Sequence, residues 1–302
     1  MTKRPASDET KLPLWAGPDD LTTYGENTWC PGCGNFAILN AAKSAIRSLE
    51  EEGVGRERVV MTAGIGQHAK IFDYLGLSGI YSLHGRAVAV AQGMKLANPD
   101  MKVIAFVGDG DTMGEGLAHL MFAAKRNSDI TVVMHDNGVY ALTTGQRSPL
   151  SPEGYKGPST PHGNTEPPLN PLVLALEAGA TFVARGYSGD ISGLAELITD
   201  GVRHRGFSFI DVLQPCVTFN NRYSEYNELA KPMTESPLPF DEALALARVR
   251  ETLPLGVFYR GERGSAEELL ARGRNPVVDH GCREDRLAAV RKLLIGSTRP
   301  GT

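Results

Sequence analysis

Residues 102–137, KVIAFVGDGDTMGEGLAHLMFAAKRNSDITVVMHDN, decide the fold class of this 302-residue chain. Residues 102–107 form a continuous apolar run, which is typical of a buried strand. Residues 117–126 have helical periodicity, and residues 129–134, DITVVM, are expected to form a second strand. A strand, a helix and a strand in this order predict a parallel strand pair that is joined by a helical crossover.

The same alternation continues on both sides of this stretch. Further strands are expected at 58–61, 80–82, 181–184 and 208–212, and further helices at 35–52, 85–96, 171–178 and 191–203. The pattern predicts an α/β fold, with a doubly wound and mostly parallel sheet and helices on both faces. A long loop rich in Pro, Gly, Ser and Thr interrupts it at 143–170, and such loops are usually functional.

We divide the chain into a polar leader at 1–20, a main domain at 21–225 and a charged C-terminal extension at 226–302, with a closing helix at 284–294. The leader lacks the apolar segment of a signal peptide. No apolar run approaches the length of about 18 residues that a membrane span needs. The net charge of -4 gives no reason to expect nucleic acid or a membrane surface as a partner.

The chain has four cysteines, Cys30, Cys33, Cys216 and Cys282, too few for a disulfide scaffold at this length. We therefore expect a cytoplasmic protein, in which such thiols are more often metal ligands or catalytic groups. Trp29-Cys30-Pro31-Gly32-Cys33 stands where a loop enters a helix. A thioredoxin-type site would follow a strand, and a structural zinc site would need two more ligands nearby. The residues alone favour a metal centre or redox chemistry.

Polar and glycine-rich motifs follow the predicted strands. These motifs are Gly64-Ile65-Gly66, Gly108-Asp109-Gly110, Asp136-Asn137-Gly138 and Pro215-Cys216. The carboxyl ends of parallel strands line the ligand crevice of a doubly wound sheet. Asp109 and Asn137 offer oxygen ligands for Mg²⁺, and the glycines and the next helix suit a diphosphate. Taken singly, both motifs could be ordinary turns. A dinucleotide site is a weaker alternative, because no strict GxGxxG follows the first strand.

Together the motifs resemble the β subunits of 2-oxoacid:ferredoxin oxidoreductases, which are thiamine diphosphate enzymes. The resemblance covers roughly residues 20–225. It lies in CPGCG at 30–34, SLHGRA at 82–87, the spacing from Gly108-Asp109-Gly110 to Asn137, NGVYxLTxGQxSP at 137–149 and QPCVTFN at 214–220. It implies thiamine diphosphate, Mg²⁺ and a [4Fe–4S] cluster as cofactors. The implied reaction is the reversible, TCA-cycle conversion of 2-oxoglutarate, CoA and oxidised ferredoxin to succinyl-CoA, CO₂ and reduced ferredoxin.

The resemblance also implies roles for residues around the cofactor. Asp109, Asn137 and the carbonyl of Val139 would hold Mg²⁺. The other expected cofactor-binding residues are Gly108, Gly110, Asp111, Gly138 and Tyr140.

Three further positions concern the substrate end. His84 would act near the thiazolium, although a solvated histidine at a helix start is the alternative. Leu142 and Thr143 would border the substrate. Lys70 would pair with the distal carboxylate of 2-oxoglutarate, unless it is a surface lysine.

The implied cluster ligands are Cys30, Cys33, Cys216 and a further cysteine that this chain lacks. Family members have Gly-Ile-Gly-Cys where this chain has Gly64-Ile65-Gly66-Gln67. We favour His68 as the fourth ligand, because it comes one residue later and lies within reach of the expected site. An imidazole in place of a thiolate should raise the cluster potential, as it does in Rieske centres. The alternatives are Cys282, a labile or differently ligated iron, and a role for His68 as an ordinary polar loop residue.

The chain carries only the diphosphate half of a thiamine enzyme. The glutamate that contacts the aminopyrimidine ring belongs, in this family, to an α subunit. We therefore expect an obligate α partner in an (αβ)₂ assembly, with ferredoxin, CoA and a 2-oxoacid as its other partners. A pyruvate- or branched-chain-specific relative is one alternative. A non-catalytic iron–sulfur electron-transfer subunit is another, but it would not need Asp109 and Asn137.

Overall fold

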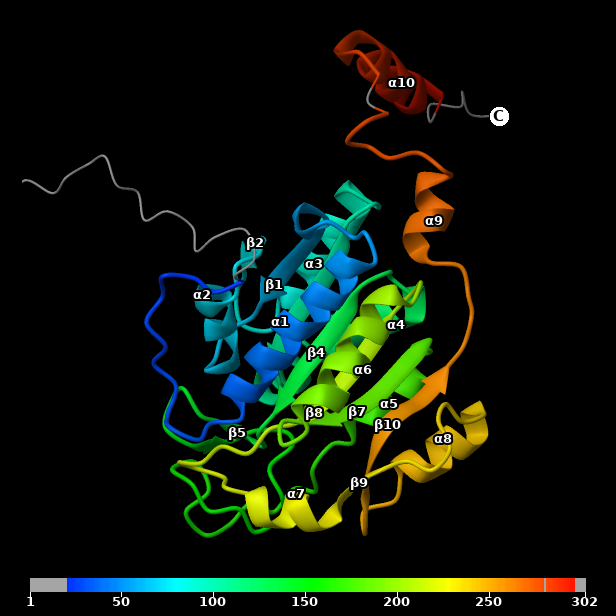
Figure 1. Cartoon of the computed structure of the whole chain (residues 1–302). Helices are drawn as coiled ribbons and strands as arrows, with labels where there is room; N and C mark the ends of the chain where they lie inside the picture. The colour runs from blue at the N-terminus through cyan, green and yellow to red at the C-terminus, as the bar shows by residue number, and fades with distance from the viewer. Residues whose placement is uncertain (1–20, 280, 297–302) are drawn as a thin grey trace, which may run out of the picture.

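The computed structural model describes residues 21–279 and 281–296, so the expected leader at 1–20 lies outside the described residues. Within them, eight strands form one sheet and two form a small ribbon. The sheet order is β2 (Ser78–Tyr81), β1 (Val59–Ala63), β3 (Lys102–Gly108), β4 (Thr131–Asp136), β8 (Ser208–Leu213), β7 (Phe182–Tyr187), β10 (Leu253–Arg260), β9 (Ala230–Pro232). Six adjacent strands of this sheet run parallel to one another, in the order β2, β1, β3, β4, β8, β7, and β10 is antiparallel to β7. The predicted, mostly parallel sheet is confirmed (Figure 1).

Helices cover both faces of the sheet (Figure 1). One face carries α1 (Asn35–Glu51), α2 (Ile71–Tyr74) and α6 (Ile191–Arg203). The other carries α3 (Ala87–Ala97), α4 (Leu117–Arg126), α5 (Pro171–Glu177) and α8 (Phe240–Ala247). The long loop at 143–170 is present. Near its start, β6 (Gln146–Arg147) pairs with β5 (Val139–Tyr140), which comes just before the loop. The helices and strands expected between residues 35 and 213 are found within a few residues of their predicted bounds.

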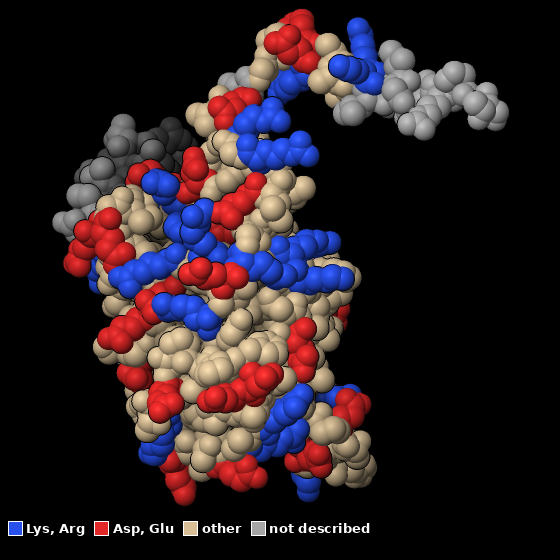
Figure 2. Space-filling model, turned by 90° about the vertical axis from the view of Figure 1, so that its right-hand side faces the viewer, with Lys and Arg blue, Asp and Glu red and all other residues tan. Residues whose placement is uncertain are grey.

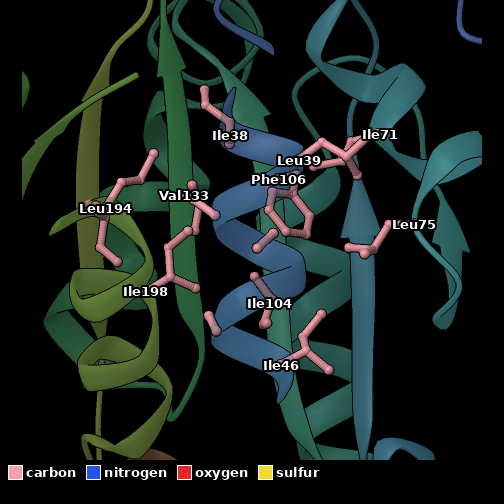
Figure 3. Packing of buried hydrophobic residues seen from close by; sticks show 14 of the residues in the cluster. Ile38, Leu39, Ile46, Ile71, Leu75, Ile104, Phe106, Val133, Leu194 and Ile198 are labelled. Carbon is pink, nitrogen blue, oxygen red and sulfur yellow. The ribbon is translucent and has the colours of Figure 1, made fainter. Parts of the chain in front are cut away.

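The central strand β3 contributes to two hydrophobic cores, one on each face. Ile104 and Phe106 pack with α1 and α6, whereas Val103, Ala105 and Val107 pack with α3 and α4. Figure 3 shows the first of these cores, where α1, α6 and the strands meet. A strand that is buried on both faces has a continuous apolar sequence, which is why β3 could be predicted from the sequence. Each fully buried large apolar side chain contributes about 1.5–3 kcal/mol.

The sheet continues into the region expected as the C-terminal extension. The strands β9 and β10 follow α7 (Tyr223–Leu229) and extend the sheet beyond β7. After β10 the chain runs to the opposite end of the molecule from β5, where α9 (Ala266–Ala271) and the expected closing helix, α10 (Arg283–Gly296), lie (Figure 1).

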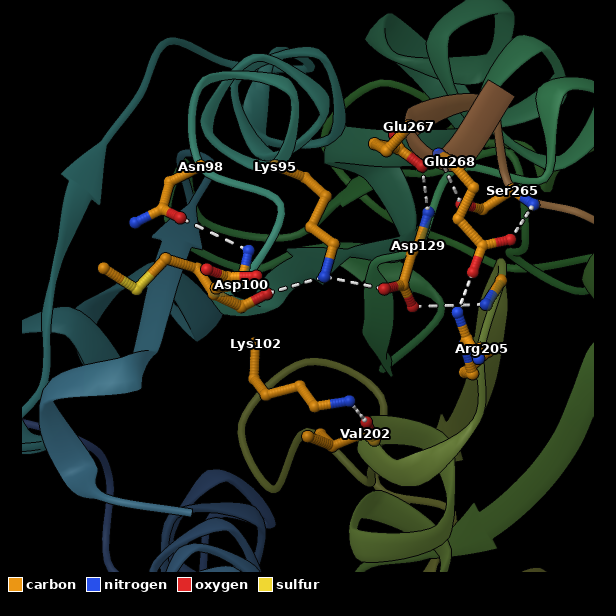
Figure 4. A network of polar contacts seen from close by, with 12 residues as sticks. Lys95, Asn98, Asp100, Lys102, Asp129, Val202, Arg205, Ser265, Glu267 and Glu268 are labelled. Carbon is orange, nitrogen blue, oxygen red and sulfur yellow. Dashed lines mark hydrogen bonds and ion pairs between the residues drawn. The ribbon is translucent and has the colours of Figure 1, made fainter. Parts of the chain in front are cut away.

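A polar network fixes the start of α9 at the amino ends of the strands (Figure 4). The main-chain N–H of Asp129 donates to Glu267 Oε2 at 2.9 Å, and Lys95 Nζ lies 2.6 Å from Asp129 Oδ2. Ser265 and Glu268 form a capping box at the start of this helix. The site described below lies at the carboxyl ends of the strands, on the side of the sheet opposite to α9.

The surface carries charges of both signs. On the face shown in Figure 2, Lys and Arg alternate with Asp and Glu. In the part of the chain that the structure describes, no helix is both long enough and apolar enough to cross a membrane.

Candidate functional site

Two adjoining cavities lie at the carboxyl edge of the parallel strands. The first cavity is lined from the loops that follow β1, β2, β3 and β4. The cysteine cavity is lined from the loops before α1 and after β1, β4 and β8. Gln67, Asn137 and Ala141 line both. These loops meet because β1, β3, β4 and β8 are consecutive neighbours in the sheet.

Asp109 is one of two acidic residues that line the first cavity, the other being Asp111. Asp109 directly follows β3 and is 2% exposed. Burial raises the pKa of its carboxyl group to about 7, and hydrogen bonds, first of all from the Ser148 hydroxyl to Asp109 Oδ2, oppose this rise. Among the described residues, no Lys or Arg forms an ion pair with it. A buried carboxylate without a cationic partner suits a metal ion.

Asn137 and Val139 supply further oxygen atoms at the next strand end. The amide oxygen of Asn137 accepts from the main-chain N–H of Val139 at 3.0 Å, and Asn220 Nδ2 donates to the main-chain oxygen of Asn137 at 2.8 Å. Gly138, between them, has a φ of +64°, and a Cβ there would lie 2.8 Å from Asn220 Nδ2. Asn137 and Val139 line the same cavity as Asp109. Together the three residues offer oxygen atoms that fit as ligands of a Mg²⁺ ion with a bound diphosphate.

Gly108, the last residue of β3, and Gly110 in the turn that follows make room for two side chains. A Cβ at Gly108 would lie 2.6 Å from His68 Nδ1, and a Cβ at Gly110 would overlap the ring of Tyr140. The Tyr140 hydroxyl donates to the main-chain oxygen of Gly110 at 3.0 Å. Residues Gly110–Glu115 form a π-helical turn, a feature that often marks functional sites. These glycines therefore set the wall of the first cavity.

We expect Gly110→Ala to displace Tyr140 and to weaken thiamine diphosphate binding about 10-fold or more, because overpacking costs about 1–3 kcal/mol. Gly93→Ala is the matched control, since a Cβ at Gly93 in α3 meets nothing within 4 Å. Isothermal titration with the cofactor and Mg²⁺ measures both affinities. Equal affinities for the two variants would contradict this account of Gly110.

Asp111 joins three loops at the back of the first cavity. Its Oδ1 accepts from the main-chain N–H of Ile65 at 3.2 Å and of Gly85 at 2.6 Å. Its expected role in cradling the phosphates stays a prediction, and its contacts in this structure hold these loops together. His84 lines the cavity, with Nδ1 3.9 Å from Asp111 Oδ1 and its ring 6.0 Å from that of Tyr140.

His68 faces the first cavity and not the cysteines. It is 5% exposed, its Nε2 lies 3.7 Å from Asp111 Oδ2, and its ring lies 5.7 Å from that of His135. Burial lowers its pKa to about 4, and Asp111 opposes the shift. This placement does not fit the expected role of fourth cluster ligand. Gln67, directly before the 3₁₀ turn His68–Lys70, lines both cavities, whereas His68 lines only the first.

The cysteine cavity brings together Cys30, Cys33 and Cys216. Burial raises the pKa of the Cys33 thiol to about 11, and the nearby Cys216 and Cys30 add to this rise. The Thr218 hydroxyl donates to Cys30 Sγ at 3.4 Å, and Gln214 Nε2 donates to Cys33 Sγ at 3.6 Å. Polar donors thus surround the sulfur atoms, as they do around thiolate-bound clusters.

The cysteine cavity suits a cluster better than a single ion. Among the described residues, no three His, Cys, Asp or Glu side chains stand close enough to share one metal. A cubane cluster keeps its thiolates apart, because each binds a different iron. Three cysteines around one cavity fit three corners of such a cluster, and no cysteine lines the fourth side.

The remaining expected residues divide between the cavities and the surface. Leu142 and Thr143 line the first cavity, as expected of residues that border a substrate. Lys70 does not line it; its Nζ donates to Thr28 Oγ1 at 2.5 Å, and Thr28 lines the cysteine cavity. Cys282 directly precedes α10, which lies at the opposite end of the molecule from β5 (Figure 1).

Three polar residues in the site had no role in the sequence analysis. Ser148 contacts Asp109, Gln214 contacts Cys33, and Asn220 holds the main chain at Asn137. All three lie in the quoted runs at 137–149 and 214–220. Their position within these motif runs was the sequence signal that could have marked them as site residues.

Comparison with known proteins agrees with this site. The family described as thiamine pyrophosphate enzyme, C-terminal TPP binding domain, matches residues 59–212, so the fold and the site define a thiamine diphosphate-binding domain. The 2-oxoacid:ferredoxin oxidoreductase subunit beta of Saccharolobus solfataricus is 41% identical over 268 residues, which are 83% of this chain and 87% of that protein. The chain belongs to the family of β subunits of 2-oxoacid:ferredoxin oxidoreductases.

Two further relatives are named for a particular oxoacid. The 2-oxoglutarate synthase subunit KorB of Methanothermobacter marburgensis is 38% identical over 240 residues, 78% of this chain and 83% of that protein. A solved 2-oxoglutarate:ferredoxin oxidoreductase from Magnetococcus marinus, with 2-oxoglutarate, coenzyme A and succinyl-CoA bound, superposes with a TM-score of 0.83. It is 34% identical, and the match covers 90% of this chain and 95% of that one.

Proposed function

We propose that this chain is the catalytic β subunit of a 2-oxoglutarate:ferredoxin oxidoreductase, which converts 2-oxoglutarate, CoA and oxidised ferredoxin reversibly to succinyl-CoA, CO₂ and reduced ferredoxin. One observation carries the proposal. The cavity with Asp109 and Asn137 and the cavity with three cysteines share a wall. A decarboxylating site and an electron acceptor must adjoin when electrons leave one at a time. The names of the two relatives above support 2-oxoglutarate as the substrate.

The residues of the chain would hold the cofactors in place. Thiamine diphosphate, when bound, supplies the ylid that adds to the keto carbon and accepts the electrons left by CO₂ loss. Asp109, Asn137 and the carbonyl of Val139 would hold Mg²⁺ and, through it, the diphosphate. His84 would hold or move a proton beside the reacting atoms, since its ring reaches the same cavity. Leu142 would exclude water from the substrate side.

The proposal includes a partner subunit. The β-subunit family name implies an α subunit, and we propose that this partner supplies the pyrimidine-binding half in an (αβ)₂ assembly. Ferredoxin would accept the electrons. We propose the cytoplasm as the location, because all four cysteines are free and such thiols persist in reducing compartments.

The chain alone should not turn over 2-oxoglutarate, whereas the complex with its α partner should. The test is anaerobic co-production of both chains and an assay of ferredoxin reduction that depends on 2-oxoglutarate and CoA. Extraction of the complex should yield thiamine diphosphate as well as iron. Robust turnover by the chain alone would refute the partner requirement, and iron without thiamine diphosphate would identify a non-catalytic electron-transfer subunit.

Lys70→Ala tests the choice of oxoacid. We propose that the Lys70 ammonium, now on Thr28, faces the distal carboxylate of 2-oxoglutarate in the complex. Loss of one charge-assisted hydrogen bond costs about 1.5–3 kcal/mol, so KM for 2-oxoglutarate should rise about 10- to 100-fold. KM for pyruvate, which lacks this carboxylate, should change little. Lys231→Ala, at an exposed lysine, is the control, and equal effects of Lys70→Ala on both substrates would count against this role of Lys70.

A further inference from the structure

Gln67 stands where the family resemblance implies a fourth cysteine. It lines the cysteine cavity together with the three cysteines, and the indole Nε1 of Trp29 donates to its main-chain oxygen at 2.7 Å. Trp29 is in turn held edge-on against Phe36 and Tyr74. Because Trp29 directly precedes Cys30, this hydrogen bond fixes the loop after β1 against the cysteine loop.

The side-chain oxygen of Gln67 is buried without a hydrogen-bond partner among the described residues. Buried polar atoms are normally paired, so an unpaired one lining a cavity marks a place where a ligand belongs. A neutral amide oxygen is a hard and weak ligand for the iron of a cluster, which prefers thiolate.

No stronger ligand competes for this position within the part of the chain that the structure describes. Beyond the three cysteines, the residues lining the cavity include no His, Asp or Glu. The Thr218 hydroxyl and Gln214 Nε2 donate to cysteine sulfur atoms, and Gln214 Oε1, also buried without a partner among the described residues, is an amide oxygen of the same weak kind as that of Gln67. His68 faces Asp111, and Cys282 lies in the segment before α10.

We infer that this chain builds a three-thiolate cluster site whose fourth corner, at Gln67, holds an exchangeable iron. The inference rests on the proposed function, in which the cysteine cavity would hold a [4Fe–4S] cluster. One-electron oxidation of [4Fe–4S]²⁺, with ferricyanide as the electron acceptor, then releases the corner iron as Fe²⁺ and leaves [3Fe–4S]⁺, so charge and iron balance. Because Gln67 lines both cavities, the weak corner lies on the wall shared with the first cavity.

The experiment follows iron in the purified αβ complex under anaerobic titration with ferricyanide. In the wild type, mild oxidation should release one of the four irons and produce the low-temperature EPR signal of a three-iron cluster. Added Fe²⁺ with a reductant should restore the original spectrum. Gln67→Cys, which supplies the missing thiolate, should keep all four irons and give no three-iron signal. Gln67→Ala, which adds no thiolate, should behave as the wild type does.

The outcomes separate this inference from the proposed function. A wild type that retains all four irons without a three-iron signal overturns the inference, while the cluster itself stands. Absence of iron and sulfide from both the wild type and Gln67→Cys, after anaerobic reconstitution, overturns the cluster as well. If Gln67→Cys does not fold, the wild-type titration alone decides, because the three-iron signal either appears or does not.

Discussion

Replacing Asp109 by asparagine should abolish turnover of the αβ complex and lower its affinity for Mg²⁺ with thiamine diphosphate by more than about 100-fold. Residues that only support metal ligands typically cost 10- to 100-fold when they are replaced, so a ligand itself should cost more. Asparagine has the same shape and keeps one oxygen, but it removes the charge that the cation offsets. Among the expected Mg²⁺ ligands, Asp109 is the one that carries a negative charge. For this reason its replacement is one of the two changes for which we predict the largest effects.

Titration calorimetry of the complex with Mg²⁺ and the cofactor measures the loss. Ser148→Ala, which removes the hydroxyl that donates to Asp109, should have a smaller effect, and Asp241→Asn, at an exposed position, should have none. Wild-type affinity in Asp109→Asn would eliminate this residue as the Mg²⁺ ligand.

The same replacement should stabilise the metal-free chain. Burial raises the pKa of Asp109 from 3.8 to about 7, so the folded state resists the ionisation that the unfolded chain undergoes at lower pH. This unfavourable contribution begins as pH rises above the unfolded pKa and reaches its full size above the folded one. The Tm advantage of metal-free Asp109→Asn should therefore grow between pH 4 and 7 and then level off, and a constant Tm difference across this range would contradict the burial argument.

Replacing Cys216 by alanine should remove the cluster and lower ferredoxin reduction by more than about 100-fold, because two thiolates cannot retain a cubane. Cys216 lies in the loop after β8 and lines the same cavity as Cys30 and Cys33, which come far earlier in the chain. Its loss should leave the first cavity intact, so thiamine diphosphate should still bind. Iron and sulfide analysis, together with the visible spectrum, measures the outcome.

Cys282→Ala is the matched control, since this cysteine lies before α10 and outside the cysteine cavity. It should keep the iron content and the activity of the wild type. Full iron content in Cys216→Ala, or loss of iron in Cys282→Ala, would mean that the cluster is held elsewhere.

Most of the fold was predictable because its signals are local. Continuous apolar runs marked the strands that are buried on both faces, as in β3, and helical periodicity marked α1, α4 and α6. The antiparallel strand β10 was not predicted, because its Gly- and Pro-containing sequence carries no strong strand pattern and its partner β7 lies about 70 residues earlier. The sequence of one strand carries little information about a distant strand with which it pairs.

The sequence by itself determined the residue types of the site and their order along the chain. Asp109 and Asn137 follow neighbouring strands, so a parallel sheet had to bring them to one edge. Only the tertiary structure decided which way each side chain faces. Asp111 turned out to anchor the loops of Ile65 and Gly85, and His68 to face Asp111. The physical reason is that side-chain direction depends on contacts between distant segments, such as the hydrogen bond from Trp29 to Gln67.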